Sequence, residues 1–328
     1  MKNALLAMVL AAGAVHGMAA DRLVGASPTS QTAARATSPG HVEPVATRLV
    51  EAAMAVVEEH RGPLAARDAT EGLSPSRAAL IGVEVSPLMT TLGSLESKRL
   101  ATDPRWAALI ARQLHDRGVR DGVTVAASFS GSFPGLNLAV MAACRALGAR
   151  LVAISSVTAS TWGADEPGFT WPEIEVMVSR RGVLPAASIA ISVGGTRDAG
   201  RDLTEEGLRI AREIQHRTAE ALGAAELRGA TLEDSIALRI GAYRAAMAGQ
   251  RPGVYVNVGG NHASLGGARA TLRHAEGWLE PRAHTAIATV SPVSVTEFWL
   301  GEGVPVMNLL DVKALAARWR LGQHRGGD

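Results

Sequence analysis

Residues 123–157 read VTVAASFSGSFPGLNLAVMAACRALGARLVAISSV, and this stretch decides the predicted fold. The apolar run 123–128 is typical of a buried strand, and it leads into a turn rich in Ser and Gly. Residues 134–147 predict a largely apolar helix, and residues 151–156 predict a second apolar strand. Strand, helix and strand in this order indicate a parallel pair of strands joined by a helical crossover.

The same alternation continues along the chain. Strands are predicted at residues 79–85, 123–128, 151–156, 188–195, 254–260, 285–291 and 304–310. Helices are predicted at residues 104–117, 134–147, 172–181, 205–222, 231–248 and 312–320. Because these strands are apolar on both faces and helices separate them, we expect an α/β fold: a doubly wound, mostly parallel sheet with helices on both faces.

The N-terminal part of the chain has a different character. Residues 1–20 combine Lys2, a short apolar run and small residues, as in a signal peptide. The run is shorter than the roughly 20 residues that span a bilayer, which favours a cleaved signal over a membrane anchor without excluding the anchor. Residues 21–44 are predicted to be a flexible linker, 45–75 an N-terminal helical segment, and 76–328 the α/β domain. We therefore expect an exported protein, periplasmic or anchored to the outer face of the inner membrane.

Composition argues against several classes of partner. The formal net charge is +2 and the basic residues are dispersed, so nucleic acid is not an expected partner. Neither an H-E-x-x-H motif, a His/Cys cluster nor EF-hand spacing is present, and we expect no metal. No G-x-G-x-x-G opens a predicted helix, so we expect no dinucleotide and no other cofactor.

The loops that follow the predicted strands are the expected ligand site, because a doubly wound sheet binds its ligands at the carboxyl ends of its strands. These loops are rich in hydroxyls and Gly, and the free amides at a helix start favour an anion. The candidate ligand-binding residues are Ser86, Thr90, Thr91, Ser128, Gly131, Gly135, Trp162, Gly194, Gly195, Arg197, Asp198, Arg201, Gly259, Gly260, Asn261 and His262.

Several of these residues have two interpretations. Ser132, just before Pro134, fits either a helix cap or a ligand contact, with the amides of residues 131–133 facing the ligand. Arg197 and Arg201 are suited to clamp a carboxylate. Lys98 either adds a positive charge to the anion site or is solvated.

Ser130 and Ser132 are also candidate nucleophiles, with loop amides as an oxyanion hole. The usual G-x-S-x-G spacing is absent, because residues 131–135 read GSFPG and place the Ser one position early. A Ser nucleophile needs a base, and His262 is a His in a predicted strand-end loop. Catalysis and binding both stay open.

The strand, Ser/Gly loop and helix of residues 119–157 resemble the phosphosugar-binding modules of sugar isomerase (SIS) domains, in which hydroxyls and amides hold a phosphate. A second resemblance, over roughly residues 45–320, is to the poly-γ-glutamate system protein family. The motifs that carry it are IGVEVSPLMTTLGSLESKR (81–99), SGSFPGLNLAV (130–140), SSVTASTWGADEPGFTW (155–171), VGGTRDAGRDLTEEG (193–207) and NVGGNHASLGG (257–267). That family commonly has a further Gly where this chain has Asn261 and His262, which weakens a triad built on His262.

The family resemblance implies an accessory protein of a poly-γ-glutamate synthesis and export system. Such a protein binds or processes the exported polyanion, and the membrane-bound synthase is an expected partner. Two alternatives remain: an SIS-like enzyme or sensor for a phosphorylated small molecule, and a non-catalytic assembly partner of the synthase. The anion site predicted from the loops and the polyanion implied by the family agree on the sign of the ligand charge.

Overall fold

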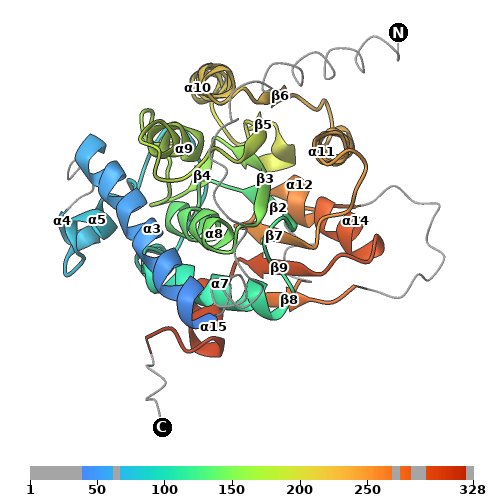
Figure 1. Ribbon diagram of the computed structural model, residues 1–328. Coiled ribbons are helices and arrows are strands. Elements are labelled where there is room, and N and C mark those ends of the chain that lie inside the picture. Colours follow the sequence, from blue (N-terminus) through green and yellow to red (C-terminus); the bar gives the residue numbers. More distant parts are fainter. Residues whose placement is uncertain (1–38, 62–66, 268–273, 282–292, 323–328) are drawn as a thin grey trace, which may run out of the picture.

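A computed structural model describes residues 39–61, 67–267, 274–281 and 293–322 of the chain (Figure 1). The predicted signal at residues 1–20, most of the predicted linker and the predicted strand at 285–291 lie outside these residues.

A seven-stranded sheet forms the centre of the molecule, with strands in the order β6-β5-β3-β2-β7-β9-β8. All neighbouring pairs are parallel except β8 with β9. The strands are β2 (Thr124–Phe129), β3 (Arg150–Ser156), β5 (Ser188–Ser192), β6 (Ala225–Leu227), β7 (Val254–Val258), β8 (Gly277–Leu279) and β9 (Val306–Leu309). This arrangement confirms the predicted α/β class and its mostly parallel sheet.

The order of the strands reverses beside β2. From β2 the chain adds β3, β5 and β6 on one side, and then returns to place β7 on the other side of β2. Phe129 at the end of β2 pairs with Val258 at the end of β7. The loops that follow β2 and β7 therefore begin side by side, at the position where doubly wound sheets bind ligands.

Helices cover both faces of the sheet (Figure 1). One face carries α7 (Arg105–Asp116), α8 (Pro134–Ala146), α9 (Trp171–Arg180), α10 (Glu205–Leu222) and α15 (Val312–Arg318), and α3 (Pro39–Arg61) packs over α7 and α8. The other face carries α11 (Leu232–Ala246), α12 (His262–Leu265) and α14 (Val295–Gly301).

The side chains of β2 show why its sequence is apolar without alternation. Val125, Ala127 and Phe129 join the hydrophobic cluster that contains α8, whereas Ala126 joins the cluster on the opposite face. All four are completely buried. A strand covered on both faces has no solvent side and so does not alternate apolar with polar residues.

The prediction of a strand at residues 79–85 is wrong. This segment has no regular secondary structure, although Leu80 and Ile81 are buried. Its backbone pairs with a neighbouring loop, because the amide of Gly82 donates to the carbonyl of Trp162 and the amide of Trp162 donates to that of Val83. The apolar run was therefore a sign of burial and not of strand pairing.

A small second sheet, α6 and two short helices lie near this segment. The sheet pairs β1 (Met89–Thr91) with β4 (Ala159–Ser160) in parallel, and α6 (Leu95–Ala101) follows β1. The short helices are α4 (Arg67–Thr70) and α5 (Pro75–Ala78). α3 begins at Pro39, so residues 39–44 belong to a helix and not to the predicted linker. Within the described ranges, no helix is both long and apolar enough to cross a membrane.

The contact between α6 and α8 depends on a glycine. A Cβ atom at Gly135, in the first turn of α8, would lie 2.4 Å from the carbonyl oxygen of Ala101. We expect Gly135→Ala to lower the free energy of unfolding by about 1–3 kcal/mol, since backbone atoms must move to relieve the clash. Gly241→Ala is the matched control, because Gly241 lies in α11 with nothing within 4 Å of the added methyl. The free energy of unfolding of that variant, measured with urea, should rise by up to about 1 kcal/mol. Equal changes at both positions would contradict the close contact between Gly135 and Ala101.

Candidate functional site

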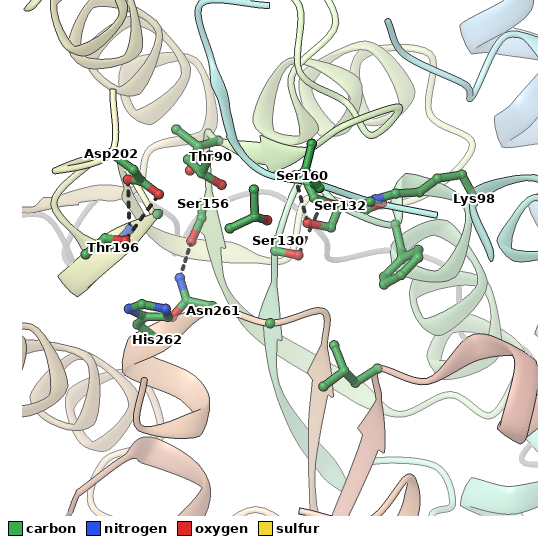
Figure 2. A pocket seen from close by; sticks show the side chains of 18 of the residues that line it. Thr90, Lys98, Ser130, Ser132, Ser156, Ser160, Thr196, Asp202, Asn261 and His262 are labelled. Atoms are coloured by element: carbon green, nitrogen blue, oxygen red, sulfur yellow. Dashed lines mark hydrogen bonds between the residues drawn. The ribbon is translucent and has the colours of Figure 1, made fainter. Parts of the chain in front are cut away.

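A cavity of about 270 Å³ opens at the carboxyl ends of the strands, beside the point where the strand order reverses (Figure 2). The loops that follow β2, β3, β5 and β7 all line it, together with the segment from β1 to α6 and Leu310 after β9. Serine and threonine are the commonest residue types on its walls. The structure thus brings together the strand-end loops that hold the predicted ligand-binding residues.

The predicted ligand-binding residues divide into two groups. Those that line the cavity, with the candidate nucleophiles, are Thr90, Thr91, Ser130, Ser132, Gly195, Gly260, Asn261 and His262. Those that do not line it are Ser86, Ser128, Gly131, Gly135, Trp162, Gly194, Arg197, Asp198, Arg201 and Gly259.

The Ser/Gly loop after β2 uses its own amides. The amide of Gly131 donates to the carbonyl of Thr158 at 3.3 Å, and the amide of Ser132 donates to Oγ of Ser130 at 3.3 Å. The residue that precedes the first turn of α8 is Phe133, so Ser132 is not the helix cap. The prediction that the amides of residues 131 and 132 face a ligand is therefore wrong, because the protein already occupies these donors.

Gly259, after β7, lets the two central loops approach each other. It has φ of +84°, and a Cβ atom at this position would lie 2.1 Å from Oγ of Ser130. Both observations require glycine here, since other residues rarely adopt such a φ. Gly259 therefore shapes the cavity without lining it.

Ser86 and Trp162 support the segment 79–91 and not the cavity. Oγ of Ser86 donates to the carbonyl of Asp165 and accepts the amide of Leu88 at 3.0 Å. Trp162 has φ of +65° and its backbone pairs with Gly82 and Val83. These contacts hold the loop after β4 against the start of the domain.

Neither predicted arginine lies in the cavity. The side chain of Arg197 is exposed, and that of Arg201 is exposed and donates to the carbonyl of Ala230 at 3.4 Å. Asp198, between them, points inward and is 4% exposed. The structure gives no support to a carboxylate clamp made by the two arginines.

Asp198 forms a buried ion pair with Arg239 of α11, which the sequence analysis missed. Nε of Arg239 is 2.7 Å from Oδ2 of Asp198, and both side chains are 1% exposed. The guanidinium also donates to Oγ of Ser128 at 3.3 Å, of Ser156 at 3.0 Å and of Ser192 at 2.6 Å. Ser128 therefore belongs to this network and not to the ligand site.

The Arg239 network fixes the floor of the cavity. Nδ2 of Asn261 donates to Asp198 at 3.0 Å and to Ser156 at 3.1 Å. Oδ1 of Asn261 accepts the amide of Ser264 at 3.0 Å and so caps α12. One buried cation thus ties the ends of β2, β3 and β5 to the loop after β7.

His262 is not part of a catalytic triad with the loop serines. Its Nδ1 accepts the amide of Arg197 at 3.3 Å. Within the part of the chain that the structure describes, it forms no hydrogen bond with Ser130 or Ser132. Asp202, also on this side of the cavity, accepts hydrogen bonds from the amide and the hydroxyl of Thr196. Thr196 begins the short helix η2 (Thr196–Asp198).

Lys98 of α6 forms part of the opposite wall (Figure 2). It is 3% exposed, and its Nζ donates to the carbonyl of Ser132 and to Oγ of Ser160, the latter at 2.7 Å. Nζ also lies 4.4 Å from the centre of the Phe133 ring. Among the described residues, Lys98 has no carboxylate within ion-pair distance. This environment is unusual, because a buried lysine is normally paired.

Burial changes the titration of Lys98 and of a nearby carboxyl. Burial lowers the pKa of Lys98 to about 7, and the charge of Asp165 opposes this shift only in part. Burial likewise raises the pKa of Asp165 to about 7. Oδ1 of Asp165 accepts the amide of Val83 at 3.2 Å, while its buried Oδ2 has no hydrogen-bond partner. Lys98, which lines the cavity, and Asp165, whose charge acts on Lys98, therefore both have pKa values near neutral pH.

Comparisons with protein-family models, with characterised proteins and with solved structures found no match to this chain. The described residues include no group of three or more His, Cys, Asp or Glu side chains that could hold a metal ion. The chemistry of the site therefore has to be inferred from its own residues.

Removing Arg239 should destabilise the protein strongly. In Arg239→Met the carboxylate of Asp198 stays buried without its cation, and we expect a loss of about 3–5 kcal/mol in the free energy of unfolding. Arg209→Met is the control, because Arg209 forms exposed ion pairs with Glu206 and Glu213. Its free energy of unfolding, measured with urea, should change far less, because exposed ion pairs contribute little to stability. Similar losses in the two variants would show that the buried network is not important for stability.

Proposed function

We propose that this protein binds a carboxylate-bearing ligand in the cavity, and that the ligand is a γ-glutamyl chain handled by an exported poly-γ-glutamate system. Two independent lines support the proposal. The cavity offers hydroxyl donors and a lysine to an anion, and the sequence motifs that line it are those that resemble the poly-γ-glutamate system family.

The observation that carries the proposal is the buried ammonium of Lys98, which has no carboxylate within ion-pair distance among the described residues. A buried cation without a carboxylate partner is costly for the folded protein, and that cost is commonly retained at functional sites. An incoming carboxylate would provide the missing counter-ion, and the hydroxyls of Thr91 and Ser130 would add donors around it, whereas Thr90 already donates to the carbonyl of Ala159 at 3.1 Å.

The dimensions of the cavity fit one small unit of a chain. About 270 Å³ is slightly less than the roughly 300–1,000 Å³ typical of sites for drug-sized ligands. A γ-linked glutamate polymer carries a carboxylate on every residue, so one residue can enter while its neighbours stay outside. Exposed Arg197 and Arg201 lie on the segment after β5 that contributes Gly195 and Thr196 to the cavity wall. They are available to the carboxylates that remain outside.

Removal of the Lys98 charge should weaken this binding strongly. In Lys98→Met we expect at least about a 30-fold loss of affinity for a γ-glutamate trimer in isothermal titration calorimetry, since a charge-assisted hydrogen bond to a desolvated carboxylate contributes about 2–3 kcal/mol. Lys313→Met is the matched control, because Lys313 is exposed and paired with Glu96. It should bind as the unmodified protein does.

The thermal stability of the same variants checks that the binding loss is local. Lys98→Met should unfold at the same or a higher temperature at pH 7, because methionine occupies the site without a desolvated charge. Equal affinity in the two methionine variants, or binding of inorganic phosphate with no response to the trimer, would overturn the proposal. The latter result would favour the alternative of a phosphorylated ligand.

Affinity should also depend on pH, in a direction set by Lys98. The pKa of Lys98 in the folded protein is about 7, so the ammonium that attracts the ligand is present below pH 7 and is lost above it. The pKa of Asp165 is also about 7, and its ionisation adds a repelling charge over the same range. We expect roughly tenfold weaker binding of the trimer at pH 8 than at pH 6 in calorimetry. Lys98→Met should lose most of this dependence, and an affinity that rises with pH would contradict the assignment.

A further inference from the structure

Three segments bring a lysine and two serines into contact on one wall of the cavity. Lys98 comes from α6, Ser160 from β4, and Ser132 from the loop after β2. Nζ of Lys98 is 2.7 Å from Oγ of Ser160, and the amide of Ser160 donates to Oγ of Ser132 at 3.2 Å. All three residues line the cavity, and Figure 2 shows their side chains gathered at one side of it.

We propose that this cluster is an acyl-transfer centre, in which Ser160 is the nucleophile, Lys98 is its general base, and the hydroxyl of Ser132 donates to the developing oxyanion. Its substrate class is an amide of a γ-glutamyl residue. The identity of the acyl group rests on the proposed function, whereas the assignment of nucleophile and base rests on the contacts within the cluster.

Lys98 meets the requirements for a base. Its Nζ is within hydrogen-bond reach of the hydroxyl that it must deprotonate, and it is held in place by the carbonyl of Ser132. A lysine serves as a base only when it is neutral, and the pKa of about 7 caused by burial makes the neutral form abundant at physiological pH. Ser–Lys pairs are a known variant of the Ser–His–Asp arrangement.

Ser160 fits the nucleophile better than the two serines suggested by the sequence. Lys98 contacts the backbone carbonyl of Ser132 and not its hydroxyl, and no hydrogen bond joins Lys98 to Ser130. Ser130 is 6% exposed, and its Oγ accepts the amide of Ser132. Ser160 is partly exposed, it lines the cavity, and its Oγ forms a direct hydrogen bond with Nζ of Lys98.

Ser132 is suited to stabilise the oxyanion. Its Oγ accepts the amide of Ser160, and its hydroxyl proton has no acceptor among the described residues. That proton is therefore available to the carbonyl oxygen of a substrate bound beside Ser160. A donor fixed before the reaction begins stabilises the developing charge without reorganisation.

The proposed reaction runs in two balanced steps. Oγ of Ser160 forms a bond to the carbonyl carbon while its proton passes to the lone pair of Lys98. The C–N bond then breaks, and the leaving amine takes that proton, which leaves an ester on Ser160 and a neutral Lys98. Water next attacks the ester and gives a proton to Lys98, and Ser160 recovers this proton as the free carboxylic acid departs.

The charges around Lys98 give the reaction a pH dependence. Asp165 is the titratable group whose charge acts on Lys98. The first turn of α8 holds no acidic residue, and Lys313 of α15 is exposed and paired with Glu96 of α6. Acylation should therefore speed up as pH rises through about 7, whereas binding of the product carboxylate weakens over the same range.

Release of p-nitroaniline from γ-glutamyl-p-nitroanilide tests the centre in the full-length protein. We expect Ser160→Ala and Lys98→Met to lose at least about 1,000-fold in rate, and Lys313→Met to stay within about twofold of the unmodified protein. Ser132→Ala should lose about 10- to 100-fold, since only one oxyanion donor is removed. Persistent release by Ser160→Ala would overturn the assignment.

A fluorophosphonate ester provides a test that does not depend on the folding of a variant. Oγ of Ser160 should form a bond to phosphorus as the P–F bond breaks and its proton passes to Lys98, and mass spectrometry of the digested, unmodified protein should locate this single adduct at Ser160. An adduct at another serine, or neither adduct nor p-nitroaniline release, would refute the proposal.

The two proposals fail in different ways. If the unmodified protein binds the γ-glutamate trimer in calorimetry but shows no turnover and no adduct, the acyl-transfer centre is refuted and the proposed binding function remains. If the unmodified protein does not bind the trimer, the proposed function is refuted even when Ser160 is labelled, and the centre then acts on another acyl group.

Discussion

The parallel pairing of β2 with β7 is the constraint on which the rest of the structure depends. The chain builds outward from β2 in one direction and then returns to the opposite side, so two strands far apart in the sequence end together. Their loops then leave the sheet at the same edge, between the helices that cover the two faces. A hollow forms there, because the two loops diverge toward opposite faces. Gly259 allows the closest approach, where a side chain would collide with Ser130.

Two basic side chains, Arg239 and Lys98, are buried near this hollow, and they differ in their partners. The charge of Arg239 is balanced by Asp198, and three serines accept hydrogen bonds from its guanidinium, which makes it a fixed part of the scaffold. Lys98 is equally buried but receives only a carbonyl and a hydroxyl. A guanidinium keeps its charge in almost any environment, whereas a lysine loses its proton when it is desolvated. The arginine therefore suits a structural role, and the lysine suits a role in which charge must change.

The sequence predicted the sheet well because the signals of its central strands are local and strong. β2, β3, β5, β7 and β9 are apolar runs between helical patterns, and burial on both faces explains that pattern. The same reasoning failed at residues 79–85, because Leu80 and Ile81 are buried without joining the sheet. A run of apolar residues reports removal from water, and it does not say which partner supplies the hydrogen bonds.

The candidate site was predictable as a place but not as a set of contacts. The strand-end loops are visible in the sequence, and topology brings them together. Arg239 could have been recognised from its spacing, since Ile236, Ile240 and Tyr243 mark the buried face of α11 on which it lies. The contact of Lys98 with Ser160 could not be predicted, because the two residues are 62 positions apart and the small β1–β4 sheet, which brings their segments together, has no clear signal in the sequence.

The source of positive charge at the site also differs from the one that the loop sequence suggested. A helix start offers a permanent partial charge through its amides, but the loop after β2 binds its amides internally. Lys98 replaces that fixed charge with one that can be lost near neutral pH. A fixed charge holds a carboxylate at every pH and so retains a carboxylate product as firmly as any other anion. A lysine with a pKa near 7 can attract an anion when it is protonated and can accept a proton from a serine when it is neutral. This difference is the physical reason to regard the wall formed by Lys98, Ser132 and Ser160 as chemically active and not only as a binding surface.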